Sequence, residues 1–155
     1  MKKVTLPPPL RFFSSEEYVP IPKAIDQFPY FLYELSAEKT PWLEKDHGLK
    51  EILTAWEELI AVMEEKHRLR QKDVKEEMDA LLALFFMALF WTNESPAAPA
   101  FWEQKEAELN VKPINFRERF QFIVARPYTY AAFRQLTELM NEQRKAAAVQ
   151  AVRKR

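Results

Sequence analysis

Both histidines of the sequence lie in Glu-x-x-His pairs, a spacing with which ferritin-like bundles hold a di-iron centre. The pairs are Glu44 with His47, and Glu64 with His67. One helix running through both pairs would hold them roughly 30 Å apart, too far for one metal centre. Gly48 can break such a helix, but the first pair then lies in a loop. We therefore expect surface charge at helix ends, with no metal site and no cofactor.

Other catalytic chemistry finds little support. The chain has no cysteine, which excludes thiol chemistry and Cys-type zinc sites, and it has no Gly-x-Ser-x-Gly motif. Adjacent glutamates such as Glu57 and Glu58 are about 100° apart on a helix and are typical of a solvent-facing surface. Asp79 could be a partly buried acid, but we expect it at the edge of an apolar stripe near a helix start, where the dipole favours an anion. We expect no enzyme.

Charge is distributed unevenly along the chain. Residues 1–111 hold 13 Lys or Arg against 20 Asp or Glu, whereas residues 112–155 hold 10 against 3. Such asymmetry can indicate a polyanion partner, and arginines interleaved with tyrosines suit phosphate contact and base stacking. The candidate binding residues are Arg117, Arg119, Arg126, Tyr128 and Arg134. The alternative is internal complementarity, in which basic helices pack beside acidic ones.

The elements that must position these residues are predicted to be helices. With one glycine and eleven prolines, the chain lacks the glycines that tight hairpins, phosphate loops and dinucleotide folds use. At 155 residues it fits one domain. We predict an all-α fold, a single-domain orthogonal bundle of five to seven helices without a β-sheet. A central apolar helix at about residues 73–91 should be surrounded by the others.

Hydrophobic periodicity supports these helices. An apolar stripe with i, i+3, i+4, i+7 spacing covers Leu49–His67. Ala80–Trp91 is apolar on every side, and it is shorter than the roughly 20 residues of a membrane span, so we expect a buried core helix and no membrane span. Capping-box spacing predicts two helix starts: Asp73 with Glu76, and Asn115 with Glu118. Pro127 is expected to begin the last helix.

Both ends of the chain differ from the helical domain expected over residues 23–140. Residues 1–22 contain three consecutive prolines and several large apolar side chains, which predict an extended arm packed on the body. The alternative is a polyproline II ligand for another protein. Residues 141–155 are good helix formers with few large apolar side chains. We expect a basic, partly detached helix or tail that loses contact with the body after about Met140.

Several short motifs follow one another from the end of the central segment onward. They are Leu89-Phe90-Trp91-Thr92-Asn93, Ser95-Pro96-Ala97, Phe101-Trp102 and Pro113-Ile114-Asn115-Phe116-Arg117-Glu118-Arg119-Phe120. This order, over about residues 75–140, resembles the YpoC-like family of small bacterial proteins. The resemblance implies a helical fold and a bacterial, cytoplasmic setting, which the absence of a signal-peptide pattern also favours. It supplies no mechanism.

These motifs also define a candidate recognition loop, because loops on a rigid scaffold often carry binding. Its residues are Trp91, Asn93, Ser95 and Trp102. The alternative is that they end one helix and fasten the next. From all these patterns we expect a non-catalytic protein–protein interaction module or scaffold, whose partner is another protein or a second copy. Nucleic-acid binding through residues 112–155 is the alternative function.

Overall fold

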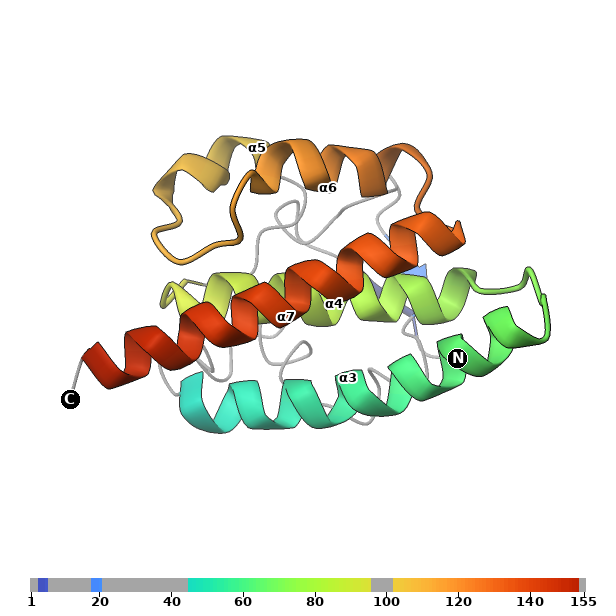
Figure 1. Cartoon of the computed structure of the whole chain (residues 1–155), viewed down its shortest axis with the longest axis horizontal. Coiled ribbons are helices and arrows are strands. Elements are labelled where there is room, and N and C mark those ends of the chain that lie inside the picture. Colours follow the sequence, from blue (N-terminus) through green and yellow to red (C-terminus); the bar gives the residue numbers. More distant parts are fainter. Residues whose placement is uncertain (1–2, 6–17, 21–44, 96–101, 154–155) are drawn as a thin grey trace.

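The computed structural model describes residues 3–5, 18–20, 45–95 and 102–153. The elements are β1 (Lys3–Thr5), β2 (Tyr18–Pro20), α3 (Lys45–Arg68), α4 (Lys75–Thr92), α5 (Trp102–Lys105), a 3-10 helix (Glu106–Glu108), α6 (Phe116–Ala125) and α7 (Tyr130–Arg153). The predicted all-α class is confirmed, and the three long helices α3, α4 and α7 dominate the molecule (Figure 1). The orthogonal crossing of the helices stays a prediction.

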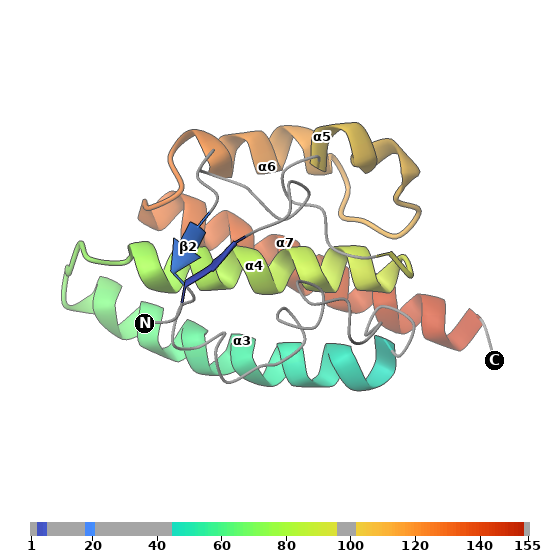
Figure 2. The ribbon, with the colours of Figure 1, turned by 180° about the vertical axis from the view of Figure 1, so that it is seen from behind.

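A short β-ribbon in the described residues departs from the prediction of no β-sheet. β1 and β2 pair antiparallel, with Val4 opposite Val19 (Figure 2). Both strands belong to the segment predicted to be extended, and extended backbones satisfy their N–H and C=O groups by pairing. How the rest of the Pro-rich arm packs lies outside the described residues.

Helix α4 is the buried centre of the bundle, as its apolar sequence predicts. Every side chain from Leu84 to Thr92 is buried. The helix packs against α3 and α7, and Phe85 contacts rings of α6 on another side. A helix enclosed in this way needs no polar face. In the part of the chain that the structure describes, no helix is both long and apolar enough to cross a membrane.

Aromatic rings build the core between α4 and the α5–α6 layer. Phe120 lies at the centre of this cluster, 5.1 Å from Phe86 and 5.0 Å from Trp102 between ring centroids. Phe116 stacks on Phe120 at 5.3 Å. Edge-to-face and offset pairs of this kind stabilise a core beyond their buried area, by about 0.5–1.5 kcal/mol each.

The two predicted capping boxes do not form. The cap of α4 is Val74, and Asp73 instead accepts from Lys66 Nζ through its backbone carbonyl at 2.9 Å. Asn115 does precede α6, but its backbone is left-handed, with φ 54° and ψ 36°, and its side chain makes no cap hydrogen bond. Asparagine tolerates this conformation better than most residues, which accounts for its presence there.

The last helix begins later and stays on the body longer than the sequence predicts. It starts at Tyr130, not at Pro127, and Thr129 Oγ1 accepts from the Ala132 N–H at 3.1 Å. Beyond Met140, Gln143 is buried and donates from Nε2 to the Val111 carbonyl at 3.0 Å. Figure 1 shows the C-terminal end of α7 reaching past the neighbouring ends of α3 and α4.

Candidate functional site

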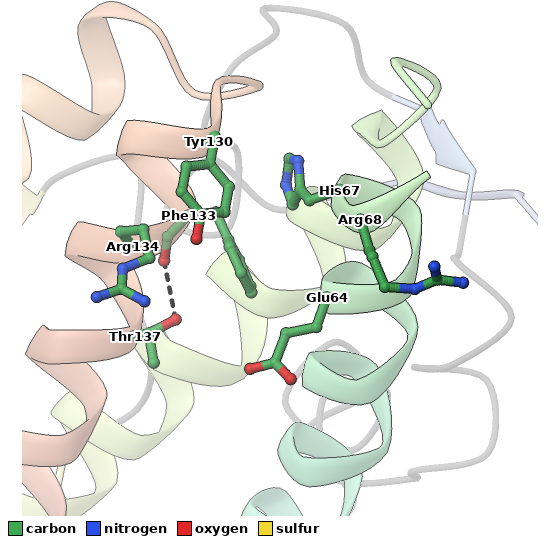
Figure 3. A pocket seen from close by; sticks show the side chains of 7 residues that line it. All are labelled: Glu64, His67, Arg68, Tyr130, Phe133, Arg134 and Thr137. Carbon is green, nitrogen blue, oxygen red and sulfur yellow. Dashed lines mark hydrogen bonds between the residues drawn. The ribbon is translucent and has the colours of Figure 1, made fainter. Parts of the chain in front are cut away.

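An open recess of about 510 Å³ lies between the last turns of α3 and the first turns of α7 (Figure 3). It is lined by Glu64, His67, Arg68, Tyr130, Phe133, Arg134 and Thr137. The sequence singled out Glu64, His67 and Arg134 for other reasons. It did not predict that they share one surface, because nothing local sets the register between α3 and α7.

Contacts along α3 and α7 fix that register. Both helices pack on α4, which leaves their facing sides next to one another. At one end His67 meets Tyr130, with ring centroids 5.0 Å apart. At the other end Arg144 Nη1 donates to Glu57 Oε1 at 2.9 Å. Since the later residue of α3 meets the earlier residue of α7, the two helices run antiparallel and flank the recess.

The imidazole of His67 is held between aromatic rings. Its centroid lies 5.2 Å from that of Phe133, in addition to the edge contact with Tyr130. Its Nε2 atom is buried and has no hydrogen-bond partner among the residues that the structure describes. Burial lowers the pKa of His67, because a charged ring would lose water without gaining an acceptor. The recess therefore has a neutral aromatic wall, not a cationic one, near pH 7.

Charged side chains stand around this wall. The carboxylate of Glu64 points into the recess, whereas the Arg68 guanidinium points away from it (Figure 3). Arg68 Nε donates to Glu65 Oε2 at 2.9 Å, which lowers the pKa of Glu65. The Thr137 hydroxyl donates to the Phe133 carbonyl at 2.9 Å and can still accept a hydrogen bond. The surface thus combines an acid, exposed Arg134, a hydroxyl and aromatic rings.

The two Glu-x-x-His pairs are not placed alike. Glu44 lies outside the described residues, while His47 and Gly48 are inside α3, so the glycine does not break this helix. Glu64 and His67 both line the recess. Among the described residues, no group of three or more His, Asp or Glu side chains is placed to hold a metal ion.

Three of the five candidate nucleic-acid-binding residues contact groups of the chain itself. Arg117 Nη2 donates to the Glu103 carbonyl at 2.6 Å, and Arg119 Nη1 donates to Glu142 Oε1 at 2.9 Å. The second pair raises the pKa of Arg119 and lowers that of Glu142. Both arginines are therefore paired within the chain, and for Arg117 the partner lies in the acidic part, as internal complementarity predicts.

Tyr128 is the third of these residues. Its hydroxyl donates to Asp79 Oδ1 at 2.8 Å, and burial together with this hydrogen bond raises the pKa of Tyr128 to about 12. Lys75 Nζ donates to the other Asp79 oxygen, Oδ2, at 2.8 Å. Arg126 and Arg134 differ, since both are exposed and no ion pair to either is found in the described part of the chain.

The candidate recognition residues fasten the end of α4 to the next elements. Trp91 is fully buried, and Trp102 packs against α6. Asn93 Nδ2 donates to the Leu89 and Val111 carbonyls at 2.8 and 2.9 Å. Its Oδ1 accepts from the Asn110 and Val111 N–H groups at 2.9 Å each. Ser95 is half-buried, with its N–H donating to the Phe90 carbonyl at 3.0 Å.

Comparison with known proteins places the chain in a family. The family model described as YpoC-like protein matches residues 46–155. This chain belongs to the YpoC-like family. It is 30% identical over 121 residues to "Uncharacterized protein YpoC" of Bacillus subtilis (strain 168), a match that covers 74% of this chain and 71% of the relative. No solved structure matches the chain.

The family match is wider than the resemblance seen in residues 75–140. It includes nearly all of α3 and the basic segment after Met140. Every residue of the recess and every hydrogen bond of Asn93 lies within the matched span, whereas β1 and β2 lie before it. The candidate site is therefore part of the YpoC-like domain.

Proposed function

We propose that this YpoC-like protein is a non-catalytic interaction module, which binds another protein at the recess between α3 and α7. The observation that carries the proposal is Tyr130, a residue that is 54% exposed at the rim of an aromatic-lined recess. Tyrosine and arginine are the residue types most enriched at the energetic centres of protein interfaces, and the recess has both.

The recess favours a partner segment of definite chemistry. An apolar side chain of the partner would pack against Tyr130 and remove its exposed area from water, at about 25 cal/mol per Å². A basic residue on one side of that anchor would face Glu64, and an acidic residue on the other side would face Arg134. The neutral state of His67 favours binding of the apolar side chain, because no charge in the aromatic wall has to be desolvated.

Photo-crosslinking tests this proposal. The intact protein carries a benzophenone amino acid in place of Tyr130, and a matched protein carries it in place of Gln121, which is exposed on α6. We expect one protein to cross-link from position 130 and not from position 121. The affinity of this partner for the purified Glu64→Lys, Arg134→Glu double variant should be about 10-fold or more lower than for the original chain, because both charge contacts become repulsive.

Two outcomes would overturn the assignment. Adducts at position 130 that are the same as those at position 121 would mean that the recess attracts no specific partner. A partner that binds the double variant as tightly as the original chain would dock elsewhere. Circular dichroism of each variant checks that the helices are intact.

A further inference from the structure

The last turns of α7 carry an exposed face that no other described helix or strand is seen to cover. Val149 is 50% exposed and Val152 is 66% exposed. At 100° per residue these two side chains lie on the opposite side of the helix from Met140 and Gln143, which are buried against the body. Lys145 and Arg153 lie on the exposed side as well, one before and one after the valines.

The outer side of α3 has the matching pattern with opposite charge. Val62 is 45% exposed beside exposed Ala61, and exposed Glu58 and Glu65 lie one turn before and one turn after them. The two acids are about 10.5 Å apart along the helix, and Lys145 and Arg153 about 12 Å, at 1.5 Å per residue. Each face is thus a small apolar patch between two like charges, and the charges of the two faces are opposite; Glu65 also pairs with Arg68 of its own helix, so a basic residue of a second copy would share this carboxylate with Arg68.

The two faces cannot meet within one chain. The Arg144–Glu57 ion pair holds α7 beside a different side of α3, and the valines of α7 point away from the body. We propose that they meet between two copies, so that the last turns of α7 from one protomer lie along the outer side of α3 of the other. In the proposed dimer each copy gives its α7 end to the other and receives the other's α7 end on its own α3, so that the two contacts are identical and related by a two-fold axis.

Charge complementarity favours a second copy over other occupants. A basic helix alone would suit a phosphate backbone, but the valines between its charges would gain nothing from one. Two copies of the tail would bring like charges together, which destabilises a helix pair. The acidic side of α3 satisfies both the charges and the apolar patch, and small side chains let the two helices approach closely.

Two contacts of about two turns each are small for an interface, so the dimer should be weak, with a Kd on the order of 10 µM. Because the charge pairs are at the surface, added salt should weaken it. Sedimentation equilibrium of the full chain at low salt, up to about 500 µM, measures the association. We expect a monomer–dimer equilibrium for the original sequence.

A charge exchange provides the decisive variants. Glu58→Lys with Glu65→Lys on α3, and Lys145→Glu with Arg153→Glu on α7, should each weaken the dimer about 10-fold or more. The protein that carries all four substitutions should regain the original affinity within a few-fold, since opposite charges meet again. The control variants Lys72→Glu and Glu76→Lys change exposed charges near the start of α4 and should leave association unchanged.

Three results would overturn the proposal: a monomer at every concentration, a dimer insensitive to these charges, or a quadruple variant as weak as the doubles. Binding to an added duplex or single-stranded oligonucleotide that is lost in the Lys145→Glu, Arg153→Glu variant would assign the tail to nucleic acid instead. The dimer involves neither Tyr130 nor Arg134. Its failure therefore leaves the partner-binding recess intact, and loss of partner binding leaves the dimer intact.

Discussion

At the scale of single residues, His67 shows how a polar side chain can serve packing. It contacts Tyr130 and Phe133 through its ring, while its buried Nε2 has no hydrogen-bond partner in the described part of the chain. A neutral imidazole can keep its proton on the other ring nitrogen, so that Nε2 loses only an acceptor interaction. Adding a proton to Nε2 would leave a buried charge without an acceptor, which is why burial lowers the pKa of His67.

This pKa shift predicts acid sensitivity. The folded protein has the lower pKa, so the unfolded chain binds the proton first as the pH falls through about 6.5, and the folded state loses stability. We expect urea denaturation midpoints to fall more between pH 7.5 and 5.5 in the original protein than in a His67→Phe variant, which keeps the ring packing. Equal pH dependence of the two proteins would contradict this account.

Other residue roles show where sequence reasoning stops. The sequence makes Asn93 a candidate recognition residue, whereas in the structure its side chain forms four hydrogen bonds with the backbone of α4 and of residues 110–111. An asparagine after an apolar helix predicts a helix end, but its long-range partners are set by how the chain returns to α4. The same holds for Tyr128 and Asp79, which are 49 residues apart.

At the scale of elements, the long helices are predictable and their ends are not. The apolar stripe of α3 and the apolar run of α4 are local sequence patterns, and each correctly predicts a helix. The helix ends depend on contacts with other elements. Lys66 of α3 donates to Asp73, which does not cap α4, and Pro127 lies in the α6–α7 connection, before the start of α7. The recess also depends on the register between α3 and α7. The sequence could therefore suggest individual residues of the recess, but not that they lie together.

The end of α7 yields a prediction at this scale. A chain that stops after Arg144 keeps the Gln143–Val111 hydrogen bond and the Arg144–Glu57 ion pair, whereas a chain that stops after Asn141 loses both and the Arg119–Glu142 pair. We expect the first truncation to change the melting temperature by a few degrees at most. The second should cost about 2 kcal/mol or more, because buried Gln143 is removed, the Val111 carbonyl loses one of its two donors, and Glu57 and Arg119 lose their ion-pair partners.

Thermal and urea denaturation of both truncated chains at low micromolar concentration, where the proposed dimer is dissociated, measure the melting temperature and the free energy of unfolding. A truncation after Arg144 that costs as much as the longer one would mean that the last turns are packed structure, contrary to their exposure. A negligible cost for the longer truncation would mean that the Gln143 and Arg144 contacts contribute little. Either result would contradict the conclusion that α7 makes its last stabilising contacts with the body at Gln143 and Arg144.

At the scale of the whole molecule, the charge asymmetry of the sequence is partly offset by the fold. Residues of the basic last part meet residues of the acidic first part in several ion pairs. These pairs are Lys112–Glu106, Arg117–Glu103 and Arg144–Glu57. Arg119 is an exception, because its partner Glu142 lies in the basic part itself. A basic stretch of sequence therefore need not form a basic surface. The chain has a net charge of zero, and basic and acidic side chains lie next to one another on its surface.

This interleaving predicts weak or absent nucleic-acid binding. Phosphate binding gains affinity by releasing counterions from the nucleic acid, and an arginine that already binds a carboxylate contributes little to it. We expect fluorescence anisotropy to show no binding to single-stranded or duplex oligonucleotides at about 50 mM salt, with micromolar protein. Arg126→Ala and Arg134→Ala together, the two exposed candidates, should then change nothing. If instead the chain binds, loses affinity steeply with salt, and loses it further in this double variant with its helices intact, these two arginines form a nucleic-acid surface and the interaction-module proposal gives way to the alternative.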